Sequence, residues 1–448
     1  MAVYRAGMWL YASNLVAQLG GYLFWFAAAA TVKADVLGEV AYLVASASIL
    51  AFALELGVPT ALTRLYPATR DSAYVSGALA LSLFGAAVAA STALWRPSLA
   101  LLTIVGMLST YYGAYFQARL DTFPIFIAAL TGQTARVALA PLLAHYGPDV
   151  LAATYAIPGA ILTALGIAAS RATPSLTKMR ELVKAGAAAW LPGVVATLGT
   201  NFGVVAAYNL ANPATAGYVY IAQVLANAAV GPATIITGVL LPYLSSTDRK
   251  EAGAEKAARL SLVISLPLAA VLIFGGRHFL ELLGAHYAQA YPALVIYTVA
   301  NILSLPASVL SSLTYAQGAY GTFLAGGLAS NAARIILYLL YGASAEGVAA
   351  SFLAGAAVAL VYYAAVQRRV AAFISHISPK IAVTAVPAAM AALGIAPAAA
   401  GAALGYAAAL KLRIVNRAEV AEVARQVLPD PIYAKAAPLA SKLLNILD

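Results

Sequence analysis

Long apolar runs, separated by short polar segments, recur from one end of the chain to the other. Each run is long enough to cross a hydrocarbon layer of roughly 30 Å as an α-helix. The runs are continuous rather than alternating, which favours helices over the strands of a barrel. The pattern predicts fourteen spans, at residues 7–30, 37–57, 73–94, 97–117, 124–145, 150–169, 187–209, 216–240, 259–275, 290–315, 322–341, 346–366, 380–395 and 396–412.

The two ends of this series need separate interpretation. The first run has no small-residue cleavage site after a short apolar core, so we expect a first span rather than a cleaved signal peptide. The last two runs are short and rich in alanine, and they form either two full crossings or a re-entrant hairpin. The expected fold is therefore an all-α polytopic membrane protein that ends in a C-terminal helix pair.

Charge is scarce and unevenly placed. The 448 residues are 63% hydrophobic and 9% charged, with 26 Lys and Arg against 16 Asp and Glu. Of the 26 basic residues, 21 fall on segments that are cytoplasmic if the N-terminus is inside, and three fall on outer loops. This bias predicts a multi-pass protein of the cell membrane with both termini in the cytoplasm. The basic excess is thus a topology signal and a contact with anionic lipid headgroups, so no nucleic-acid partner is needed.

Parts of the chain repeat. "VAQLG" at 16–20 matches "VATLG" at 195–199, an offset of 179, and "GEV" at 38–40 matches "GYV" at 217–219 at the same offset. Six spans separate the copies, which makes the repeat parallel, with a pseudo-two-fold axis along the membrane normal. We expect an N-lobe of six spans at 1–169, a cytoplasmic linker at 170–186 and a C-lobe of six spans at 187–366. The pair of spans 13 and 14 at 380–412 and a cytoplasmic amphipathic tail at 413–448 complete the chain.

Two arginines lie inside spans. "GQTARVAL" at 132–139 matches "SNAARIIL" at 330–337, so each lobe carries an amide followed by an arginine: Gln133 with Arg136, and Asn331 with Arg334. A charge at mid-membrane costs at least ~2.5–3.5 kcal/mol and normally faces the bundle interior or water. We expect both arginines to line a cavity between the lobes and to bind an anion such as phosphate, which suits the planar guanidinium. The alternative is a structural ion pair, for example between Arg136 and Glu55.

Other polar groups within the spans are few. Glu55, near the inner end of the second span, is a candidate coupling residue for an ion, or it pairs with Arg64. Amides gather in the repeated spans and are candidate substrate ligands in the cavity or partners in interhelical hydrogen bonds: Asn14, Gln18, Asn201, Gln223 and Asn227.

Signals of an enzyme are absent. The four histidines are scattered, the outer carboxylates are dispersed, and no P-loop or acidic metal motif is present. We therefore expect no catalytic residues, no metal and no cofactor.

Two motifs resemble a known family. "LELGVPTALTRLYP" at 54–67 resembles that family's motif at the end of its second span, and "ELLGAHYAQAYPAL" at 281–294 resembles the stretch before its tenth. The chain thus resembles a polysaccharide-biosynthesis flippase of the Wzx/RfbX type, in the MOP (MATE-like) exporter superfamily. The resemblance implies transfer of a lipid-linked (polyprenyl-pyrophosphate) oligosaccharide from the cytoplasmic to the outer leaflet by alternating access, in a monomer that meets membrane lipids and glycan-assembly proteins. The alternatives are a MATE-like drug/cation antiporter and a non-transporting partner of a glycan synthase.

Overall fold

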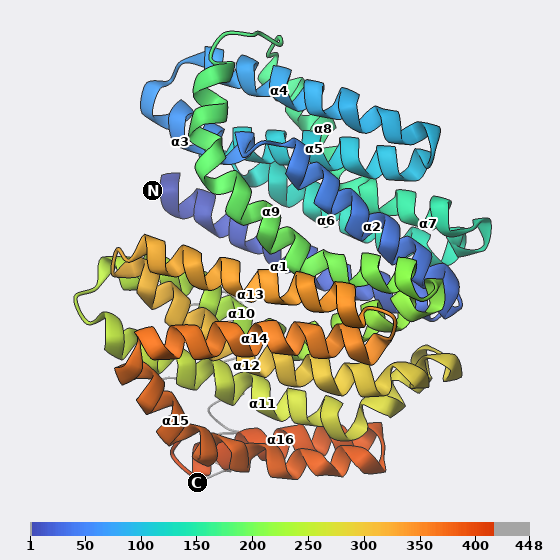
Figure 1. The fold of residues 1–448 in the computed structure, drawn as a ribbon, viewed down its shortest axis with the longest axis vertical. Helices are drawn as coiled ribbons and strands as arrows, with labels where there is room; N and C mark the ends of the chain where they lie inside the picture. The colour runs from blue at the N-terminus through green and yellow to red at the C-terminus, as the bar shows by residue number, and fades with distance from the viewer. Residues whose placement is uncertain (1, 416–448) are drawn as a thin grey trace. The chain divides into compact units, whose positions relative to one another are not determined.

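The structure is a computed structural model that describes residues 2–415 (Figure 1). The predicted amphipathic helix of the tail falls on residues 417–429, outside the described part. The described residues form sixteen α-helices: α1 (Ala2–Ala29), α2 (Ala34–Leu54), α3 (Val58–Thr69), α4 (Ser72–Ala90), α5 (Pro97–Ala118), α6 (Phe123–Leu143), α7 (Pro148–Ala153), α8 (Ile157–Ser170), α9 (Met179–Leu210), α10 (Pro213–Ser246), α11 (Lys250–Leu283), α12 (Tyr291–Ala316), α13 (Tyr320–Tyr341), α14 (Ala345–Val366), α15 (Arg368–Ala382) and α16 (Ile395–Lys411). Five 3₁₀ helices accompany them: η1 (Ser91–Leu94), η2 (Ala144–Tyr146), η3 (Thr154–Ala156), η4 (Ala285–Ala290) and η5 (Val383–Leu393).

Eleven helical segments of the described residues are long and apolar enough to cross a membrane. This confirms an all-α polytopic membrane protein; fourteen spans are expected from the sequence, and eleven segments of the described residues meet these criteria. The expected spans at 7–30 and 216–240 fall on the helices α1 and α10. The expected span at 396–412 falls on α16, which is apolar but has 17 residues. The orientation of the termini stays a prediction.

The chain divides into two compact units. One unit comprises Met1–Ile221 and Arg334–Val348, and the other comprises Ala222–Ala333 and the chain from Ala349 onward. Within the expected linker at 170–186, α8 ends at Ser170 and α9 begins at Met179. The lobe boundaries drawn from the repeat stay a prediction.

In the first unit, α2 packs lengthwise against α9, and the two helices lie side by side in Figure 1. At one end, Gly57 adopts φ +71°, and a Cβ on it would lie 2.3 Å from the carbonyl oxygen of Gly186. This left-handed turn ends α2 and lets the two backbones touch, which only glycine permits at both positions. At the other end, the rings of Tyr42 and Tyr208 stack with centroids 4.1 Å apart.

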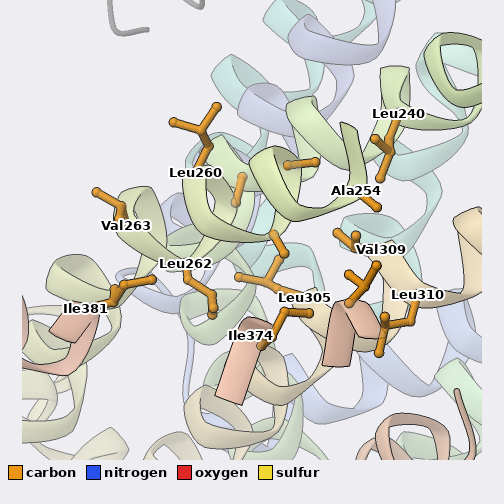
Figure 2. Close-up of a cluster of buried hydrophobic side chains, with 14 of the residues drawn as sticks. Leu240, Ala254, Leu260, Leu262, Val263, Leu305, Val309, Leu310, Ile374 and Ile381 are labelled. Atoms are coloured by element: carbon orange, nitrogen blue, oxygen red, sulfur yellow. The ribbon is translucent and has the colours of Figure 1, made fainter. Parts of the chain in front are cut away.

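In the second unit, α11 is the central helix and packs against α12, α15, α16 and η5. Its buried side chains form an apolar core with α12 and α15, part of which is drawn in Figure 2. The helices η5 and α16 pack closely against each other at small residues. A Cβ on Gly401 would lie 2.5 Å from the carbonyl oxygen of Pro387, and one on Gly405 would lie 2.4 Å from that of Thr384. This is the close backbone approach that a Gly-x-x-x-Gly pattern provides between membrane helices.

Candidate substrate-binding site

Arg136 is buried in the interior of the first unit. It lies on α6 and is 2% exposed. Its guanidinium carbon lies 4.8 Å from the centre of the Phe24 ring and 4.2 Å from that of the Tyr155 ring. Phe24 comes from α1 and Tyr155 from η3, so the arginine joins three elements. The two rings hold the cation by cation–π attraction, which is strongest where water is excluded.

No acidic group neutralises this charge. Within residues 2–415, Arg136 forms no ion pair or hydrogen bond, and its Nε is buried without a partner. The expected alternative, an ion pair with Glu55, is not observed. A buried guanidinium without an anion is costly, and the two rings offset only part of that cost. Arg136 is therefore a cation that lacks an acceptor among residues 2–415.

Gln133 lies one turn before Arg136 on α6 and, like Arg136, has a buried polar atom without a hydrogen-bond partner. It is buried, and its Oε1 has no hydrogen-bond partner. The side chain packs against α1 at Gly20, where an added Cβ would lie 2.6 Å from its Cβ. The predicted amide–arginine pair is thus close together on the α1-facing side of α6.

An aromatic shell extends this site beyond what the sequence indicated. The Trp25 ring lies 4.2 Å from that of Tyr220, 5.9 Å from that of Tyr155 and 5.1 Å from that of Phe24. Aromatic residues are common in membrane spans, and nothing in the sequence marked Phe24 or Tyr155. Their role depends on contacts between segments more than a hundred residues apart.

The second arginine occupies a related setting. Arg334 belongs to the same unit as Arg136 and lies on α13, one turn before Tyr338. The Tyr338 hydroxyl donates a hydrogen bond of 3.2 Å to the carbonyl oxygen of Gly199 on α9. Gly199 is the repeat counterpart of Gly20, so α1 and α9 use equivalent positions to contact the arginine-bearing helices α6 and α13. The amide of Asn331 is engaged with its own helix, through a 2.8 Å bond from Nδ2 to the Gly327 carbonyl.

The repeat is also visible in a direct contact. Gly38 and Gly217 are equivalent at the offset of 179 residues, and they touch: a Cβ on Gly38 would lie 2.6 Å from the backbone nitrogen of Gly217. A residue meets its own counterpart where a two-fold axis passes. The contact agrees with the predicted parallel repeat.

The remaining amides are placed differently from one another. Asn14 and Gln18 are exposed on α1, and Gln223 is buried on α10. Asn201 donates to the carbonyl of Thr197 in its own helix, at 3.1 Å. Asn227 accepts a 2.9 Å hydrogen bond from Asn301 of α12, an interhelical bond in the second unit. A substrate-binding role for these amides stays a prediction.

Glu55 follows the end of α2, is 8% exposed, and lies against the hydroxyl of Thr110. Neither Arg64 nor Arg136 pairs with it in the described part of the chain. Its role as a coupling residue stays a prediction.

The structure also gathers outer carboxylates that the sequence suggested were dispersed. Arg96 lies 2.6 Å from Glu39 and 3.3 Å from Asp149, and Ser98 donates to the same aspartate. The hydrogen bond to Glu39 raises the pKa of Arg96, so this guanidinium keeps its charge. The cluster ties the first turns of α2 and α7 to the start of α5. Among the described residues no group of His, Asp and Glu is arranged to hold a metal ion.

Comparison with solved structures identifies the fold. No family model matches the chain, and no curated protein matches it. The lipid II flippase MurJ in an inward closed conformation matches over 90% of this chain and 96% of its own, with 15% identity and a TM-score of 0.70. An inward-facing multidrug resistance MATE family transporter of the MOP superfamily matches over 80% and 95%, with 16% identity and a TM-score of 0.61. A MOP superfamily transporter from Pyrococcus furiosus, described as having a binding pocket of reverse polarity, matches over 83% and 96%, with 15% identity and a TM-score of 0.56.

Proposed function

With the fold of MOP-superfamily transporters as the starting point, we propose that this chain is a flippase. It moves a lipid-linked oligosaccharide, carried on polyprenyl pyrophosphate, from the cytoplasmic to the outer leaflet by alternating access. Solved structures that share its fold include transporters and a lipid II flippase, and none of those compared is named as an enzyme. This agrees with the expectation that the chain is not an enzyme.

Arg136 is the observation that supports this substrate class. It is a permanent cation within a membrane-crossing segment, with a buried Nε and no anion among the described residues. A substrate that brings a diphosphate would supply the missing charge and accept hydrogen bonds from the guanidinium. In a lipid-linked glycan the diphosphate joins the apolar chain to the sugar. A buried cation therefore selects a charged group that all such lipids share.

The same observation weighs against a drug/cation antiporter, the second function with this fold. A cationic substrate would be repelled by Arg136 and would need a carboxylate in its place. Glu55 is the buried carboxylate that such a function would use, and it lies at the end of α2 against Thr110. Fold likeness alone leaves both functions open, and the charge of the candidate site favours the anion.

Ligand-dependent stabilisation tests the substrate class. Purified protein should gain thermal stability from a short-chain polyprenyl pyrophosphate glycan, by about 2.7 kcal/mol at a hundredfold excess over Kd. The matching polyprenol glycan without phosphate should give little stabilisation, because it cannot pair with the guanidinium. Equal stabilisation by both lipids, or stabilisation only by organic cations, would contradict the proposal.

A further inference from the structure

Helix α15 has two unlike faces. It follows α14 after a break at Gln367 and runs from Arg368 to Ala382. One face carries the buried residues Val370, Ile374 and Ile381. Figure 2 shows Ile374 and Ile381 directed into the same apolar cluster as Leu262 of α11. The apolar face of α15 is thus buried against the rest of the second unit, and the opposite face is free to contact another molecule.

The opposite face is exposed and basic. It carries Arg368, Arg369, Ala372, Ser375, His376, Pro379 and Lys380. Arg369 pairs with Glu251 of α11 at 2.7 Å, and its side chain stays 80% exposed. In the described part of the chain, Arg368 and Lys380 form no ion pair. Their two charges are therefore available to an external anion.

Two further basic residues, Lys411 and Arg413, lie at the end of α16 that is close to the end of α15. The carbonyl of Thr384 in η5 approaches Gly405, and that of Pro387 approaches Gly401, so η5 and α16 run antiparallel. By this register the end of α16, with the exposed Lys411 and Arg413, lies beside the end of α15. The shared burial of Ile381 and Ile414 in one cluster agrees with this register.

The charges also fix the depth of α15. The segment Arg368–Leu393 is apolar enough on average to count as one span, but Lys380 would then lie near its centre. An exposed lysine at mid-membrane is costly. We therefore place the membrane-embedded part of this segment in η5, whose eleven residues rise about 22 Å at the 3₁₀ repeat of about 2 Å per residue. This leaves α15 at the membrane surface.

We infer that α15 is an interfacial helix whose basic face, formed by Arg368, Lys380, Lys411 and Arg413, binds the headgroups of anionic phospholipids. The predicted topology places this face in the cytoplasmic leaflet. Each basic residue near an anionic surface strengthens binding by about fivefold, and salt screens the effect. This surface does not depend on the proposed substrate.

The absence of cysteine makes the test direct. Ala372 is exposed on the basic face, and Ala372→Cys would carry a single environment-sensitive fluorophore. The labelled protein is reconstituted in nanodiscs of phosphatidylcholine with phosphatidylglycerol, and either lipid carries a headgroup spin label in turn. At low salt, spin-labelled phosphatidylglycerol should quench several-fold more than spin-labelled phosphatidylcholine at equal mole fraction. At about 0.5 M salt the difference should disappear.

Variants assign the effect to the basic face. In Arg368→Gln/Lys380→Gln most of the several-fold preference for phosphatidylglycerol should be lost, because each of the two charges strengthens binding by about fivefold. Arg277→Gln removes a charge from the far end of α11 and should leave the preference unchanged. An unaltered melting temperature of the double variant shows that it is folded. Equal quenching by both lipids in the parent, or an undiminished preference in the folded double variant, would overturn the inference. So would loss of the preference when inorganic phosphate replaces chloride at equal ionic strength, because the surface would then bind free anion.

Discussion

Replacing Arg136 separates a ligand-binding arginine from a structural one. The informative variants are Arg136→Met, which fills a similar volume without charge, and Arg136→Lys, which keeps the charge and loses the planar fork. Both avoid the large cavity that alanine would leave beside the two rings. The two variants differ in charge while leaving the packing of α1 against α6 largely filled.

The structure sets the size of each effect. The guanidinium lies 4.8 and 4.2 Å from the centres of two rings, contacts worth about 0.5–2 kcal/mol each. Against these stands a cost of at least ~2.5–3.5 kcal/mol for the charge at mid-membrane. The rings thus offset part of the cost and leave a small net difference, and no carboxylate among the described residues loses a partner when Arg136 is removed. We therefore expect Arg136→Met to change the free energy of unfolding by less than about 2 kcal/mol. A charge-assisted hydrogen bond to diphosphate is worth about 1.5–3 kcal/mol, so binding should weaken roughly ten- to a hundredfold.

Two measurements on the same samples decide the question. Melting temperature reports the structural term, and titration with a polyprenyl pyrophosphate glycan reports the binding term. We expect Arg136→Met to melt within a few degrees of the parent and to bind weakly, with Arg136→Lys intermediate in binding. Normal binding together with a strongly lowered melting temperature in both variants would refute the reasoning and assign Arg136 to structure alone.

Three further outcomes follow from packing and charge. Arg96→Ala breaks both of its ion pairs and should lower the free energy of unfolding by about 1 kcal/mol, since the side chain is 30% exposed; an unchanged melting temperature would show that the pairs contribute nothing. Gly38→Ala places a Cβ 1.7 Å from a backbone carbonyl oxygen of α10 and should lower the free energy of unfolding by more than about 2 kcal/mol. The control Gly7→Ala enters open space and should be tolerated, and equal melting temperatures of the two variants would contradict the close contact between α2 and α10. A double-mutant cycle on Asn227 and Asn301 should give a coupling of about 0.6–1.7 kcal/mol from their interhelical bond, and zero coupling would argue against that bond.

The sequence predicted the helices well because insertion in a bilayer depends on local hydropathy. Membrane-crossing segments are read from a run of some twenty residues, without knowledge of their neighbours. Average hydropathy was less informative where one apolar segment contains two different kinds of helix. The segment from Arg368 to Leu393 contains an amphipathic α-helix followed by a 3₁₀ helix. The two are distinguished in the structure, where Ile374 and Ile381 of the α-helix pack into the apolar cluster.

The site was predictable in its charge and not in its surroundings. The repeated pattern of an amide followed by an arginine marked Gln133 and Arg136 because buried charge within a span is rare. The shell of Phe24 and Tyr155 could not be predicted, because aromatic residues are common in spans and these two come from distant segments. The suggested ion pairs of Glu55 with Arg64 and Arg136 do not form among the described residues, because the sequence does not show which side chains meet between helices.

Transport of the proposed substrate is the most direct test of the central claim. Proteoliposomes would carry a fluorescent polyprenyl pyrophosphate glycan, and a membrane-impermeant quencher would report the fraction that reaches the outer leaflet. We predict transfer that exceeds that of protein-free vesicles, that is lost for the matched polyprenol glycan, and that is strongly reduced in Arg136→Met. Absence of transfer by folded parent protein, together with proton- or sodium-driven efflux of organic cations from the same vesicles, would contradict the flippase account and support a cation antiporter.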